Sequence, residues 1–120
     1  MDNRDRTFRV AAASTDGYTV EIHCGRATKF YIYQLVVDEW VYVELRKLEA
    51  VCGGGEHDAA SMRERAKRLS DCRYVTASRI GAGAESILQQ NGIMPMALPG
   101  DLMEALDKIY SYNTIQNLFN

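Results

Sequence analysis

Hydrophobic and polar positions follow two different periods along this chain, and each period predicts its own kind of element. Short runs that are apolar, aromatic or β-branched are typical of strands. The run Phe8–Ala13 ends in small alanines, which predicts a central strand covered on both faces. A shorter extended piece is expected at Thr19–Val20. The other runs that predict strands are residues 30–37, 40–46, 74–78 and 93–98.

Apolar positions three or four residues apart predict helices in the second half of the chain. One helical face collects Ala59, Met62, Ala66 and Leu69. A second helix is expected to open at residues 81–83 and to end at residues 91–92, where an Asn-Gly pair is typical of a helix end. A third is expected to begin at residues 101–104, which resemble a capping box. The tail, residues 111–120, is expected to be a short helix or an arm that faces a partner.

The order of these elements predicts an α/β fold. A hairpin over residues 30–46 followed by alternating helices and strands implies a mixed sheet with about three helices packed on it. Pro95 cannot donate to a strand ladder, so its strand is expected at an edge. With 120 residues, the chain 1–120 is expected to form a single domain with its core over residues 8–110.

Composition narrows the functional classes. A net charge of −2 argues against a general nucleic-acid binder, which needs a basic excess to neutralise phosphates. No apolar run has the length of a membrane span or of a secretory signal, so we expect a cytoplasmic protein without a membrane partner. Three cysteines without a paired motif argue against a disulfide framework and against a thiol oxidoreductase.

Two glycine-flanked segments carry the chemistry, because each holds a histidine and a cysteine. Imidazole and thiolate are ligands for soft and borderline metals, including iron–sulfur clusters. The candidate cluster ligands are His23, Cys24, Cys52 and His57. Cys24 either binds metal or packs inward as a small apolar residue, and His57 is either a ligand or solvated. Cys72 is expected to pack in the core.

Glycines and cations surround these candidates. Glycine lets the backbone approach a bulky ligand, and the loop glycines singled out are Gly17, Gly25, Gly53, Gly54, Gly55, Gly81 and Gly83. Arg26 and Arg79 are candidates to offset the charge of an anionic ligand, and surface salt bridges are the alternative. The glycine patterns fit neither of the common phosphate-binding motifs, so a nucleotide site is not predicted.

Carboxylates do not indicate an enzyme. Nuclease chemistry with two metal ions needs several carboxylates that converge at strand ends. The first predicted strand has none, and Asp16, Glu21 and Asp71 do not form a convincing set. We therefore expect a protein without catalytic residues.

These stretches together resemble the dinitrogenase iron–molybdenum cofactor biosynthesis family, which includes NifX, the NafY core domain and the C-terminal domain of NifB. The family pattern is His-Phe-Gly, an alanine, then Phe and Ile-Tyr, and the chain has Cys24 where the family usually has phenylalanine. The resemblance covers about residues 8 to 110. The matching stretches are residues 10–17, 23–27, 30–33, 52–58, 78–84 and 92–100.

The resemblance implies a ribonuclease H-like fold with a five-stranded mixed sheet. It also implies transient binding of iron–sulfur or iron–molybdenum cluster precursors, with cofactor-assembly proteins and apo-dinitrogenase as partners. The family's cluster-binding histidine maps onto His23. We therefore expect a non-catalytic cluster carrier. The sequence does not decide whether two copies of the chain share one cluster as a homodimer. The alternative is a metal-free interaction or regulatory module on the same fold.

Overall fold

The computed structural model describes residues 7–50 and 56–118, and the side chains of the second segment from Ala59 onward. Within these residues a five-stranded sheet has the order β4-β3-β1-β5-β6. Strand β1 is antiparallel to β3 and parallel to β5, so the predicted five-stranded mixed sheet is confirmed. Its strands are β1 (Thr7–Ala13), β3 (Lys29–Val36), β4 (Glu39–Lys47), β5 (Tyr74–Ala77) and β6 (Met94–Ala97).

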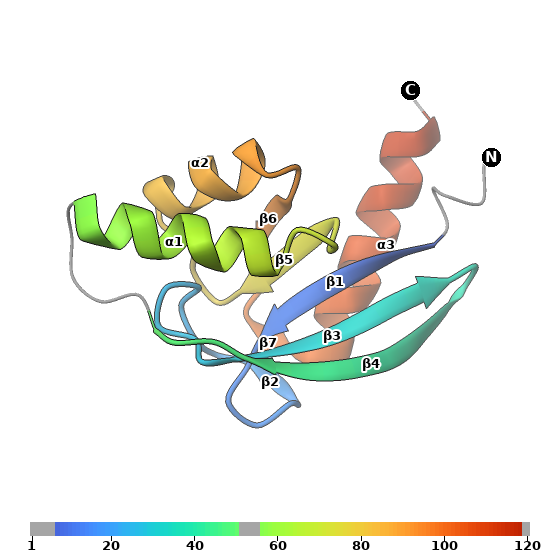
Figure 1. The fold of residues 1–120 in the computed structure, drawn as a ribbon. Helices are drawn as coiled ribbons and strands as arrows, with labels where there is room; N and C mark the ends of the chain where they lie inside the picture. Colours follow the sequence, from blue (N-terminus) through green and yellow to red (C-terminus); the bar gives the residue numbers. More distant parts are fainter. Residues whose placement is uncertain (1–6, 51–55, 119–120) are drawn as a thin grey trace.

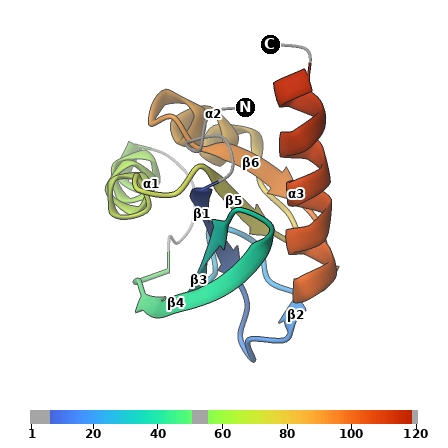
Figure 2. The same cartoon turned by 90° about the vertical axis from the view of Figure 1, so that its right-hand side faces the viewer.

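Three helices in the described residues cover the two faces of this sheet (Figures 1 and 2). Helices α1 (Glu56–Arg68) and α2 (Ala82–Gln90) lie on one face. Helix α3 (Leu102–Leu118) lies on the other. Residues 111–118 of the predicted tail are helical, but they continue α3 without a break and do not form a separate element. The ribonuclease H-like classification stays a prediction.

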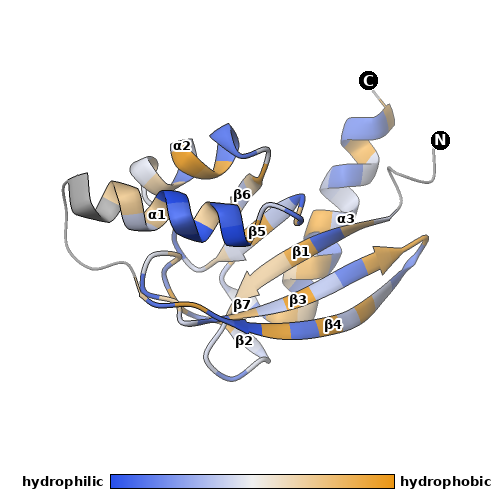
Figure 3. Ribbon diagram, in the orientation of Figure 1, coloured by the Kyte–Doolittle hydropathy of each residue, from blue (hydrophilic) through white to orange (hydrophobic). Residues whose placement is uncertain are grey.

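Strand β1 separates two apolar cores, as its pattern predicts. Ala11 and Ala13 pack toward α1 and α2, whereas Val10 and Ala12 pack toward α3. All four side chains are fully buried, because successive residues of a strand point to opposite faces. Figure 3 shows apolar colour along the C-terminal half of β1 and strongly polar positions in the C-terminal half of α1.

The smaller elements follow local rules, with two differences from the sequence-based expectation. Pro95 does lie in an edge strand, β6. The short piece Thr19–Val20 forms β2, and it pairs with β7 (Gly100–Asp101), which the pattern does not predict. The hairpin turns at Val37, which has a positive φ of 62°, one residue earlier than the Asp38-Glu39 connection expected. No helix in the described part of the chain is long and apolar enough to cross a membrane.

Candidate functional site at the carboxyl edge of the sheet

The loops with candidate chemistry meet at one edge of the sheet. Strands β1, β5 and β6 run parallel, so their carboxyl ends lie at the same edge. The small β2–β7 ribbon lies beside this edge, next to the arrowhead of β1 (Figure 1). In open α/β sheets, ligands bind outside the carboxyl ends of the strands. This edge is therefore the place to look for a site.

His23 lies on a turn at this edge that is built by main-chain hydrogen bonds. Residues His23 and Arg79 form a parallel bridge, in which Cys24 N donates to Arg79 O at 3.0 Å. The His23 carbonyl then accepts from Arg26 N at 3.1 Å and from Ala27 N at 3.0 Å. The side chain of His23 is exposed. The backbone thus presents an imidazole at the surface without using that imidazole to hold the turn.

Positive charge and a helix N-terminus lie next to His23. Residues at one pairing position of neighbouring strands project to the same face, so Arg79 accompanies His23. Arg26 lies on the same turn, and both arginines are exposed. Gly81, two residues beyond Arg79, is the N-cap of α2. Unpaired amides at a helix start favour an anion, so the structure brings several of the predicted anion-compensating groups to one edge.

The predicted loop glycines differ in whether the fold needs them. Gly17 has a φ of +82°, and a Cβ there would lie 2.9 Å from a ring carbon of Tyr31. Gly81 and Gly83 lack a positive φ, and a Cβ at either would meet open space. Gly25 lies within the His23 turn. Gly17 is therefore required by local geometry, whereas packing does not explain Gly81 or Gly83.

The structure favours the packing alternative for Cys24. Its side chain is 1% exposed and belongs to the core beneath α1 and α2. Burial raises the pKa of this thiol to about 11, although the guanidinium of Arg65 opposes the effect. Thiolate is the metal-binding form, so a thiol in this environment is a poor ligand. Cys72 is also buried in this core, and burial raises its pKa to about 12.

Part of the predicted ligand set lies outside the described residues. Cys52 and the glycines Gly53, Gly54 and Gly55 fall in that part, and of His57 only the backbone, in the first turn of α1, is described. Among the described side chains, no group of three or more His, Cys, Asp or Glu residues is placed to hold a metal ion.

The three carboxylates weighed for nuclease chemistry do not share one site. Asp16 accepts hydrogen bonds from the amides of Tyr18 and Thr19 at 2.8 and 2.9 Å, which lowers its pKa. Glu21 accepts from the amide and the hydroxyl of Thr15. Asp71 precedes β5, at the opposite edge of the sheet, where two arginines bind it. The three do not converge on one point.

Arg65 is a residue of this site that the sequence analysis misses. It lies on α1 with 3% of its surface exposed. Its Nη1 donates to the carbonyl oxygens of Cys24 at 3.2 Å and Ala27 at 2.8 Å, and so holds the His23 turn from behind. The available signal is its spacing, three residues after Met62 and four before Leu69, which puts a charge on the apolar face of the helix.

This chain matches a family profile and several curated proteins over most of its length. A family profile described as "Dinitrogenase iron-molybdenum cofactor" matches residues 6–112. A protein named FeMo cofactor biosynthesis protein NifB from Chlorobaculum tepidum is 32% identical over 111 residues, which cover 91% of this chain and 24% of that protein. The protein of the same name from Bradyrhizobium diazoefficiens is 35% identical over 92 residues, 75% of this chain and 18% of its own length. The chain thus spans a quarter or less of these curated relatives.

A solved structure is similar in fold. The NMR structure of a Thermotoga protein provisionally assigned to NifB aligns with a TM-score of 0.53 and 24% identity. The alignment covers 87% of this chain and 88% of that one. At this identity the likeness concerns the fold alone.

Proposed function

Because this chain belongs to the dinitrogenase iron-molybdenum cofactor family, we propose that it is a non-catalytic carrier of iron–sulfur or iron–molybdenum cluster precursors in nitrogenase cofactor biosynthesis. The names of its relatives, FeMo cofactor biosynthesis proteins, support this assignment. The observation that carries it is the exposed His23 on a hydrogen-bonded turn, next to Arg79, at the carboxyl edge of the sheet. The cluster is cargo here, received from one assembly protein and passed to another.

His23 is the principal protein ligand in this proposal. A neutral imidazole nitrogen binds iron. The main-chain hydrogen bonds that close the turn do not involve the imidazole ring, so the ring is available to a ligand. Arg26, Arg79 and the first amides of α2 offset the negative charge of the cargo. Gly81 and Gly83 leave the space at that helix start open.

The described donor set suits loose holding. One imidazole does not saturate a cluster, so the cargo keeps other ligands of its own or of the protein that delivers it. Cys52 and His57 remain proposed further ligands, and a second copy of the chain is another source. Cys24 is left out because its thiol is buried. Few protein ligands favour release, whereas a closed four-ligand site binds tightly.

An anoxic titration with an iron–sulfur cluster ligated by small thiolates tests the proposal. We expect the wild-type protein to acquire the visible absorption of a bound cluster. His23→Ala should weaken uptake by about tenfold or more, because it removes a ligand. Thr28→Ala, an exposed change close to the same turn, should leave uptake unchanged. Equal binding by wild type and His23→Ala would remove His23 from the mechanism.

A metal-free interaction module is the second candidate, and the end of α3 favours it. Ile115 and Leu118 lie three residues apart on α3 and are 52% and 70% exposed, and neighbouring exposed apolar side chains are typical of interaction surfaces. If the protein is a metal-free interaction module, we expect no cluster uptake by the wild-type protein and loss of partner binding when residues 115–119 are deleted. The titration above therefore separates the two candidates directly.

A further inference from the structure

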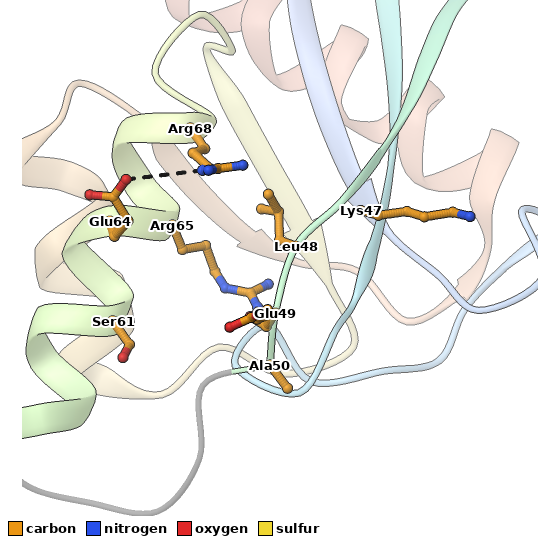
Figure 4. Close-up of a pocket in the computed structure, with 8 residues that line it drawn as sticks. All are labelled: Lys47, Leu48, Glu49, Ala50, Ser61, Glu64, Arg65 and Arg68. Carbon is orange, nitrogen blue, oxygen red and sulfur yellow. Dashed lines mark hydrogen bonds and ion pairs between the residues drawn. The ribbon is translucent and has the colours of Figure 1, made fainter.

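One buried side chain, that of Arg65, donates to main-chain carbonyl groups of two separate stretches of chain. The guanidinium of Arg65 donates from Nη1 to the carbonyl oxygens of Cys24 and Ala27, which flank the exposed part of the His23 turn. Its Nη2 donates to the carbonyl oxygen of Glu49. Figure 4 shows the Arg65 side chain reaching from α1 toward Glu49, in a pocket of about 520 Å³.

The surroundings of Arg65 indicate more than space filling. Its guanidinium carbon lies 5.1 Å from the centre of the Phe30 ring, beneath the turn. Its Nε–H has no hydrogen-bond partner among the residues that the structure describes. Enclosing a guanidinium is unfavourable unless its donors are used, and an apolar side chain of similar volume would fill this place at lower cost. What the arginine adds is a link between carbonyl groups of two separate segments.

We propose that Arg65 is a positioning residue for cluster binding, because it holds the His23 turn against α1 and against the chain after β4. The inference rests on the proposed function. The bridge to Arg79 ties the turn to the sheet, and Arg65 ties the same turn to α1 and to the chain after β4. Without the guanidinium we expect the sheet to persist, while the His23 turn loses its anchor on α1.

Two matched arginine variants test the claim in the anoxic cluster titration. Arg65→Met should lower uptake by about tenfold, since it removes hydrogen bonds from a charged donor. The control is Arg68→Met, on the same helix and at the same pocket. Arg68 is exposed, and its ion pair with Glu64 is long, with 4.0 Å between Arg68 Nε and Glu64 Oε1. The control should stay within about twofold of wild type, because exposed ion pairs contribute little. Wild-type uptake by a folded Arg65→Met protein would overturn the proposal.

A double-mutant cycle with His23 separates positioning from general destabilisation. If Arg65 acts through His23, Arg65→Met should cause no further loss of uptake in the His23→Ala background. A further loss of about tenfold in that background would mean that the two effects are independent, and would overturn the proposal. If Arg65→Met does not fold, Arg65→Lys takes its place in the cycle, with a partial loss expected from a single compact donor.

Hydrogen exchange in the metal-free protein gives a readout that does not depend on cluster uptake. The amides of Arg26 and Ala27 close the turn by donating to His23 O. Their exchange should accelerate about tenfold in Arg65→Met but not in Arg68→Met, at equal global stability. Unchanged exchange would overturn the positioning role. Accelerated exchange without uptake by any variant would instead defeat the carrier function and leave the anchoring role in place.

Discussion

His23 and Cys24 are neighbours in the chain but lie in opposite environments. The bridge to Arg79 gives this stretch the alternation of a strand, so His23 faces solvent and Cys24 faces the core. The residue type alone does not distinguish these roles, because both side chains are soft-metal ligands. The environment does, since it leaves the imidazole accessible and keeps the thiol protonated.

The buried thiols should be slow to react in the folded protein. In a Cys52→Ser variant, a disulfide reagent at about pH 8 should label Cys24 and Cys72 slowly, because little of either thiol is ionised there and neither is accessible. Denaturant should make both react at once. Rapid labelling of the native variant, followed by absorbance, would contradict the burial of Cys24.

Val37 offers a second prediction at this scale, on stability. A β-branched residue with a φ of 62° is strained, so Val37→Gly should raise the free energy of unfolding by about 1 kcal/mol. The neighbouring Val36 is similarly exposed but extended, within β3. Val36→Gly should therefore lower stability by about 1 kcal/mol, since glycine weakens a strand. Urea denaturation of the pair gives the comparison, and a loss of stability in both would refute the strained turn.

At the scale of elements, periodicity predicts most of the strands and helices. The alanine-rich β1 and the stripe of α1 have clear periods, and the structure places both as expected. Strand β7 is missed because two residues carry no period, and it exists only by pairing with β2. The end of α3 is misread because its apolar residues Ile115 and Leu118 are exposed and do not pack in either core, so they do not continue the buried stripe of the helix.

The candidate site could be predicted only in part, because some of its contacts join residues far apart in the sequence. His23, Arg79 and Gly81 are singled out from composition and local motif, and the structure places them at one edge. Arg65 is missed because its partners are main-chain carbonyls, which no sequence motif encodes. A charge on an apolar helical face is the one warning that the sequence offers.

A cluster of charges joins β1, β4 and the α1–β5 connection, and predicts the response of the fold to acid. Both oxygens of Asp71 accept from Arg46 at 2.6 Å, and one also accepts from Arg9 at 3.0 Å. Hydrogen bonds from Arg46, and then from Arg9, hold the pKa of Asp71 well below its usual range.

Asp71→Asn should lower the free energy of unfolding by about 1 kcal/mol at neutral pH, a modest value because the pair is screened by solvent. A carboxyl whose pKa falls on folding stabilises the protein above the pKa of the unfolded chain. The difference between wild type and variant should therefore hold above about pH 4 and shrink as the pH falls below it. Denaturant unfolding at several pH values measures this, and a difference that grows in acid would contradict the assignment.

On the scale of the whole molecule, the parallel strands decide where the candidate site lies. Strands β1, β5 and β6 end at one edge, so loops from distant parts of the sequence meet there. Asp71 precedes β5 at the opposite edge, and Arg9 and Arg46 bind it there. Sequence patterns identify the loops but not their meeting point, because strand order comes from long-range pairing.

The bridge that holds the His23 turn involves only main-chain atoms. We therefore expect the fold to tolerate other side chains at position 23. A cysteine, an aspartate or a tyrosine there should keep the same backbone position and the same exposure to solvent. If His23 holds the cargo as proposed, one substitution at this position should change which metal the protein prefers, while the sheet and its cores are left as they are.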